Sequence, residues 1–312
     1  MAQLLKLADY VSRYEIDIYR YPSRYVRLKK ERWLRLKQDW EATRSSHGNF
    51  PLFQHYEEET SLSLWKRTRS MFSRKDKNET KEEVDLPTDW QLRHRSLEEI
   101  KTNFLQELLE FQLNWASSTV SEISHLNREY YNDKLLQYLL QELPDTFFIF
   151  YHPVLFARKA PVDCDIIILS PNDLWIITPL HGNKETIFSA LEGRYWQRRD
   201  EDQQESFLHP NISLKRTKTV IQSILEKEGL SIPVRTAILS KDSYIDVGQG
   251  TQLAKLIDRR NLFEFRDSFL KMQAPIKHTQ LKIADAILQS SLTISESRLN
   301  ADIEEDSLEN EK

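Results

Sequence analysis

The sequence predicts an α/β fold, of the α+β type, in which a mixed β-sheet flanked by helices follows a mainly helical N-terminal region. Two observations predict it. Apolar residues recur at helical spacing as far as Leu143, and after Pro144 they gather in short strand-like runs instead. Two of those runs, at 162–169 and 174–177, are separated by the turn sequence Ser-Pro-Asn-Asp at 170–173. We therefore expect an antiparallel hairpin there.

The first expected helix runs from Tyr25 to Trp40, where large apolar residues repeat at helical spacing. Lys and Arg are dense between Arg24 and Arg35, and again at 65–77. Two interpretations stay open for the first stretch. It is either a basic, aromatic helix that binds nucleic acid, or an amphipathic helix that packs its Trp face on the rest of the protein.

A second helical region begins at Ser96, which forms a capping-box pattern with Glu99. An apolar stripe follows and the pattern continues to Leu143, with a break expected near residues 117–118 because one helix of that length would be unusual. Before this region, residues 73–83 contain no large apolar side chain and cannot bury enough surface to offset their ordering entropy. We expect a flexible linker there.

Beyond the hairpin, we expect strands at Tyr195–Trp196 and Pro233–Leu239, a helix at Ile212–Leu225, and short helices at 253–257 and 262–271. The predicted organisation is a mainly helical N-terminal region at 1–74, a linker at 75–90, a helical connector at 91–130, a sheet-containing domain at 131–275, and a C-terminal helix with a disordered acidic tail at 276–312.

Composition limits the possible classes of protein. Hydrophobic residues make up 39% and charged residues 29%, which predicts a real core with much solvated sequence. The net charge of −4 gives no global attraction to nucleic acid, so such binding would need local basic patches. The single cysteine, Cys164, excludes an intrachain disulfide and a cysteine-rich zinc site. No signal-peptide core or membrane-length apolar run is present, which predicts a cytoplasmic protein with no membrane partner.

Residues 162–180 read VDCDIIILSPNDLWIITPL, with Trp196, HPNIS at 209–213 and IPVRTAIL at 232–239 downstream. Together these resemble the nuclease-related (NERD) domain of the PD-(D/E)xK nuclease-like group, which is found in bacterial proteins. The resemblance covers about a third of the chain, from Asp133 to about Leu239. It implies a restriction-endonuclease-like sheet. It also implies a site in which two carboxylates hold Mg²⁺ or Mn²⁺, the metal activates water, and a lysine assists.

Placed on this sequence, the family's Asp falls on Asp165, the candidate metal ligand. The family's Glu-x-Lys falls on Thr178 and Leu180, and Thr178 stands 13 residues after Asp165, as the family spacing requires. A hydroxyl cannot supply the charge of a carboxylate, and leucine cannot supply an ammonium group. The resemblance therefore implies a vestigial site, in which only Asp165 remains of these three groups.

Other groups are candidates to replace the missing ones. The acidic residue that the family often carries on the preceding helix falls on Asp133. Lys184 and Glu185 lie just past the second hairpin strand and are candidates to reach back to the site. His181 and His209 have no metal-binding spacing. The family's Asn-Pro…Gln element is replaced by His209-Pro210…Ser213.

Three hypotheses follow. The first is a catalytically degenerate domain that binds nucleic acid or a protein partner, with no cofactor. The second is a metal-dependent nuclease with a rearranged site of Asp133, Asp165, Lys184 and Glu185. The third is a structural or interaction protein without a nucleic-acid role, whose N-terminal aromatic helices form the working surface.

Overall fold

The computed structural model describes residues 1–45, 95–191, 194–201, 203–247, 254–272 and 274–298. Two compact units make up the chain, one of residues 1–22 and 107–312 and the other of residues 23–106. None of the helices within the described ranges combines the length and the apolar character needed to cross a lipid bilayer.

The larger unit contains a six-stranded mixed sheet in the order β1-β3-β6-β7-β11-β13. β3 and β6, and β6 and β7, pair antiparallel, while the remaining neighbours pair parallel. The predicted α/β class with a mixed sheet flanked by helices is confirmed. The strands of this sheet are β1 (Gln3–Leu7), β3 (Phe148–Tyr151), β6 (Ile166–Leu169), β7 (Leu174–Pro179), β11 (Val234–Leu239) and β13 (Lys255–Ile257).

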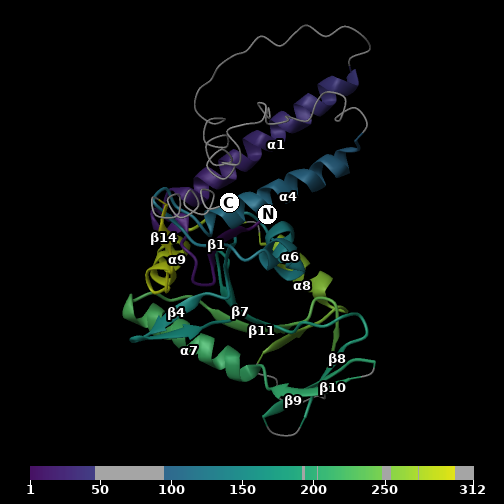
Figure 1. The fold of residues 1–312 in the computed structure, drawn as a ribbon, viewed down its shortest axis with the longest axis vertical. Coiled ribbons are helices and arrows are strands. Elements are labelled where there is room, and N and C mark those ends of the chain that lie inside the picture. The colour runs from purple at the N-terminus through teal and green to yellow at the C-terminus, as the bar shows by residue number, and fades with distance from the viewer. Residues whose placement is uncertain (46–94, 192–193, 202, 248–253, 273, 299–312) are drawn as a thin grey trace, which may run out of the picture. The chain divides into compact units, whose positions relative to one another are not determined.

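Helices cover both faces of this sheet (Figure 1). On one face, a single apolar cluster joins alternate strand residues such as Ile166, Ile168 and Ile177 to α6 (Lys134–Glu142), α8 (Leu262–Leu270) and the end of α4 (Leu97–Trp115). On the other face, α7 (Asn211–Lys227) packs against β7 and β11, and also against β4 and α9 (His278–Gln289). The alternation of side chains along each strand thus separates two buried layers.

The predicted hairpin is present as β6 and β7, and its turn is closed by side-chain chemistry. The Ser170 backbone N–H donates to the carbonyl of Asp173 at 2.9 Å, and the Ser170 hydroxyl donates to the Asp173 carboxylate at 2.5 Å. The other Asp173 oxygen accepts from Arg235 of β11 at 2.9 Å. The helix predicted at Ile212–Leu225 and the strand at Pro233–Leu239 are confirmed as α7 and β11.

Three parts of the sequence prediction differ from the structure. Residues 3–7, placed in a mainly helical region, form β1 at the edge of the sheet, parallel to β3. The helix expected at 253–257 is wrong, because Lys255–Ile257 pairs with β11 as β13. The helical pattern expected after residue 118 is interrupted by β2 (Glu122–Ile123), which precedes the short α5 (Glu129–Asn132) and then α6. In each case a long-range pairing overrides a weak local signal.

A second, four-stranded sheet has the order β10-β9-β8-β12, and the strand expected at Tyr195–Trp196 is its β9. Two-stranded sheets pair β4 with β5 and β2 with β14. The strands are β4 (Val154–Ala157), β5 (Ala160–Asp163), β8 (Ile187–Ala190), β9 (Tyr195–Arg199), β10 (Gln204–Leu208), β12 (Tyr244–Asp246) and β14 (Glu296–Ser297).

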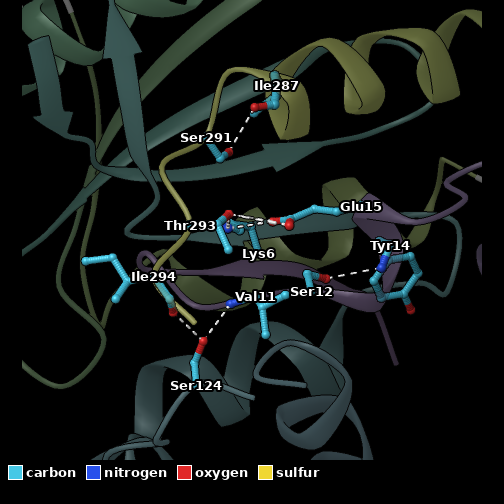
Figure 2. A network of polar contacts seen from close by, with 10 residues as sticks. All are labelled: Lys6, Val11, Ser12, Tyr14, Glu15, Ser124, Ile287, Ser291, Thr293 and Ile294. Atoms are coloured by element: carbon cyan, nitrogen blue, oxygen red, sulfur yellow. Dashed lines mark hydrogen bonds and ion pairs between the residues drawn. The ribbon is translucent and has the colours of Figure 1, made fainter. Parts of the chain in front are cut away.

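A buried ion pair ties the N-terminal segment into the larger unit (Figure 2). Lys6 of β1 is fully buried, and its ammonium group donates to Glu15 at 2.5 Å and to the Thr293 hydroxyl at 2.6 Å. Glu15 ends a single 3-10 turn at Arg13–Glu15, and Ser124 bridges the Val11 N–H and the Ile294 carbonyl. These contacts fix both chain segments beside the sheet, so residues 1–22 belong to this unit.

The smaller unit holds most of α1 (Tyr21–Ser45) and the start of α4. The expected helix at Tyr25–Trp40 and the capping box at Ser96 are confirmed. The Ser96 N–H donates to Glu99 at 2.6 Å, and the Glu99 N–H donates to Ser96 at 3.2 Å. The Trp33 and Phe104 rings lie 5.3 Å apart. The predicted linker at 75–90 and the basic stretch at 65–77 lie outside the described residues. The disordered acidic tail is expected from Ser295, but Glu296–Ser297 form β14 and pair with β2, and the rest of the tail from 299 lies outside the described residues.

Candidate active site

The candidate site lies where β3 ends and β6 begins. Phe150 pairs with Ile167, and farther along the same two segments Val154 pairs with Asp163 in an unchanged register, which places His152 opposite Asp165. On the other side of Asp165, Ile166 pairs with Ile177, so the next position brings Thr178 opposite Asp165. Three neighbouring segments therefore present His152, Asp165 and Thr178 at one end of the sheet.

The Asp165 side chain points toward α7 and is only 5% exposed. Its two oxygens accept hydrogen bonds from Ser213 at 3.0 Å and from Thr217 at 3.1 Å. The Thr217 hydroxyl also accepts from the Asp165 backbone N–H at 2.9 Å. Ser213 and Thr217 stand four residues apart, so both face the sheet from the same side of the helix. The carboxyl group is thus held by hydroxyls rather than by charges.

Burial raises the pKa of Asp165 above its ordinary value, because removal from water disfavours the charged form. The hydroxyls of Ser213, Thr217 and Thr178 and the nearby His152 act in the opposite direction, without reversing the shift. The site therefore holds a carboxyl group more easily protonated than a typical surface aspartate.

Thr178 occupies the position of the missing family glutamate, as the sequence placement requires. It is buried on β7, and its hydroxyl makes no hydrogen bond of ordinary length within the described part of the chain. Leu180, at the position of the missing lysine, is half-buried and its backbone N–H donates to the Leu239 carbonyl at 2.8 Å. Backbone pairing thus continues through the Glu-x-Lys position, but the acid and the base are absent.

Asp133 lies at the start of α6 and has a structural role there. One of its oxygens accepts from the backbone N–H groups of Leu135 and Leu136, at 2.9 and 3.0 Å, so it caps the start of α6. The other oxygen accepts from the Tyr151 hydroxyl at 2.6 Å, and Tyr151 belongs to the apolar cluster on the α6 side of the sheet. Asp165 faces α7 on the opposite side, so the two carboxylates do not converge.

Lys184 and Glu185 lie in the loop after β7, and their side chains are exposed. The side-chain Oδ1 of Asn183 accepts from the Glu185 and Thr186 backbone N–H groups at 2.9 and 3.0 Å, which fixes this turn. Within the described ranges, no group of three or more His, Cys, Asp or Glu side chains is arranged to hold a metal ion. Asp133, Asp165 and Glu185 therefore do not form the rearranged carboxylate cluster that the sequence allowed.

His152 is a functional candidate that the sequence did not reveal. Its backbone has a φ of 48°, a left-handed conformation that is strained for a residue other than glycine. Burial lowers the pKa of the imidazole, and His181 lowers it further, while Asp165 and Asp133 raise it. His152 therefore lies within electrostatic reach of these three groups. Only the strand register could have shown this, because His152 and Asp165 are distant in sequence.

Cys164 and His209 both have contacts that indicate structural rather than catalytic roles. Cys164 is buried and burial raises its thiol pKa to about 11, which does not suit a nucleophile. His209 accepts from the Asn211 N–H at 3.1 Å at the start of α7, and its ring lies 5.3 Å from that of Trp196. It therefore orders the helix start and does not pair with His181 in a metal site.

The residues present do not fit the divalent metal ion that the family resemblance implies. A hard cation needs several ionised oxygen ligands. Here Asp165, the carboxyl group onto which the resemblance places the family's metal ligand, has a raised pKa, has both oxygens engaged by hydroxyls, and faces the neutral Thr178. The donor set is thus too poor in charge for Mg²⁺ or Mn²⁺.

Residues 128–240 match the model of the nuclease-related domain family. The chain is also 37% identical, over 118 residues, to a protein of Geobacillus stearothermophilus named RNA 2',3'-cyclic phosphodiesterase. That match covers 36% of this chain and 36% of the relative, so the chain spans about a third of the length of the curated relative it matches. The comparison with solved structures gives no match. With the hairpin, the flanking helices and the family match in agreement, the chain carries a nuclease-related domain at residues 128–240.

Proposed function

We propose that this nuclease-related domain binds nucleic acid without cutting it. The observation that carries the proposal is the state of Asp165, whose carboxyl group is buried, bonded to Ser213 and Thr217, and opposite Thr178. A phosphodiester-cleaving centre of the family type needs a metal held by several carboxylates, together with a cation. This arrangement supplies neither.

Local positive charge supports nucleic acid as the partner. α1 carries eight Lys or Arg residues against three Asp or Glu, a net charge of +5 from 8 − 3, although the whole chain has a net charge of −4. Lys30 and Arg35 are among its exposed side chains. A helix of this charge density attracts a phosphate backbone by releasing counterions, and such binding weakens as salt rises.

The test uses the full chain with plasmid and single-stranded DNA in Mg²⁺ or Mn²⁺. We expect binding that weakens steeply with salt and no cleavage of either substrate. A matched variant with Lys30→Gln and Arg35→Gln should bind more weakly, with a shallower salt dependence. Cleavage that disappears in an Asp165→Ala variant would refute the loss of catalysis. The absence of any salt-dependent binding would leave a protein partner as the better explanation.

A second candidate function, favoured by His152, is metal-independent hydrolysis of an RNA phosphodiester. Two histidines can divide the work, a neutral one accepting a proton from water and a protonated one donating to the leaving oxygen. Burial lowers the pKa of His152, which suits the base, and the exposed His181 lies within its electrostatic reach. The relative's name, RNA 2',3'-cyclic phosphodiesterase, points to the same chemistry.

Hydrolysis of a 2',3'-cyclic nucleotide in the presence of a chelator separates the two candidates. The second candidate predicts turnover that survives chelation and falls in His152→Ala and His181→Ala variants. The leading proposal predicts no turnover in the wild-type chain. Turnover that is unaffected by both substitutions would point to a contaminating enzyme and would remove the second candidate.

A further inference from the structure

The sheet formed by β10, β9, β8 and β12 has two chemically different faces. Its inner face carries Phe188, Trp196 and Phe207, with ring centroids 5.9 Å apart for Phe188–Phe207 and 6.5 Å for Trp196–Phe207. Phe188, Trp196 and Ile245 are buried. The strand alternation therefore places the intervening residues on the outer face.

The outer face combines an exposed apolar pair with a polar row. Tyr195 and Leu208 are direct cross-strand partners, 52% and 59% exposed. The next row is formed by Ser206, Gln197 and Ser189, which pair in sequence across β10, β9 and β8. An exposed aromatic ring beside amide and hydroxyl groups is a surface that can stack a base and hydrogen-bond to its edges.

Arginines stand on this face or next to it. Arg199 stands on it directly opposite Gln204, and Arg194 precedes β9 in the chain. Arg259 lies over the Tyr244 ring at 5.9 Å from its centroid, at the β12 end of the sheet. Within the part of the chain that is described, none of these three arginines forms an ion pair with a carboxylate, and Asp246 is the acidic residue that the strand register places on this face. Among the described residues of this face, Arg199 and Arg259 outnumber the carboxylate of Asp246 by one, which favours an anionic occupant.

We propose that the outer face of this sheet binds single-stranded nucleic acid, with a base stacked on Tyr195 and phosphates beside Arg199 and Arg259. This inference rests on the proposed function. It adds that the bound nucleic acid is single-stranded and that it binds at this sheet face. A duplex would present stacked bases and phosphates alone, and would leave the exposed ring and the polar row unused. A single strand uses the ring, the polar row and the arginines together.

The experiment measures fluorescence anisotropy of a labelled oligo(dT), an oligo(U) of the same length, and a duplex, each titrated with the full chain. Tyr195→Ala should weaken binding of the single strands by about 5- to 150-fold, the range for loss of one stacked base. Tyr195→Phe should keep the affinity, because the ring remains. Arg199→Gln should lower the slope of log affinity against log salt by about 0.7, the effect of one phosphate contact.

Lys227→Gln is the matched control, since Lys227 is an exposed cation in the last turn of α7, away from this sheet face. It should bind as the wild type does. Wild-type binding that survives both Tyr195→Ala and Arg199→Gln, but falls with Lys30→Gln and Arg35→Gln, would overturn the sheet-face site and leave the proposed function standing. A preference for the duplex would overturn the proposal that the bound nucleic acid is single-stranded. No binding of any probe would overturn both proposals.

Discussion

Thr217→Val tests whether the hydroxyl bonds to Asp165 hold α7 on the sheet. Valine keeps the shape of threonine but removes a hydroxyl that donates to the Asp165 carboxylate at 3.1 Å and accepts from its backbone N–H at 2.9 Å. Thr217 is fully buried, so water cannot replace either bond. The carboxylate oxygen and the backbone N–H each lose a partner at a cost of about 1–3 kcal/mol, so the variant should lose about 2–6 kcal/mol of unfolding free energy.

Urea denaturation followed by circular dichroism measures this loss. Thr217→Ser is the control, because it keeps the hydroxyl and removes one methyl group, at a cost of about 1 kcal/mol. The loss in Thr217→Val should be larger at pH 8 than at pH 5, because the missing donor favoured the ionised form of Asp165. Equal losses for valine and serine, at both pH values, would show that the hydroxyl does not stabilise the buried carboxyl group.

Three further predictions concern the carboxyl groups of Asp165, Asp133 and Glu15. Asp165→Asn should be at least as stable as the wild type at pH 7, because the raised pKa means that folding penalises the ionised carboxylate. The difference should shrink as the pH falls through the raised pKa of the folded protein, and it should vanish only below pH 3.8, where the unfolded chain is protonated as well. Urea midpoints measured from pH 7 downward check it. Asp133→Ala should lower stability by about 0.5–2 kcal/mol through loss of the α6 cap, again measured by urea denaturation. Glu15→Gln should cost about 3 kcal/mol at pH 7 by leaving the buried Lys6 ammonium without its counter-charge, and the loss should shrink toward pH 10, because burial already lowers the pKa of Lys6 and the neutral amine needs no partner.

The sequence was most informative where structure is decided locally. The turn at 170–173 closes through Ser170 and Asp173, whose side chains stand inside the turn itself. The capping box of Ser96 and Glu99 and the apolar stripe of α7 are equally local. By contrast, β1 pairs with β3 across more than a hundred residues, and β13 has only three residues, so neither carried a periodic signal.

The site was predictable only in part, for the same reason. The family spacing located Asp165 and Thr178 correctly as neighbours, since the hairpin register fixes both. The partners of Asp165 come from α7, and their i, i+4 spacing at Ser213 and Thr217 was the available signal that they share a helix face. No sequence signal marked His152. Its left-handed backbone and its place opposite Asp165 arise where the β3–β6 pairing ends and the β4–β5 pairing begins.

Under the proposed function, the absence of a glutamate at 178 and a lysine at 180 fits the hydroxyl contacts to Asp165. A carboxylate beside a metal and a second carboxylate must stay ionised and partly free to coordinate. Thr178 stands opposite Asp165, and the contacts that limit the cost of burying this carboxyl group are hydrogen bonds such as those from Ser213 and Thr217. Restoring glutamate at 178 and lysine at 180 would therefore place a second buried acid against oxygens that are already engaged. Metal binding would also require Ser213 and Thr217 to release Asp165, so the proposed loss of catalysis involves α7 as well as the hairpin.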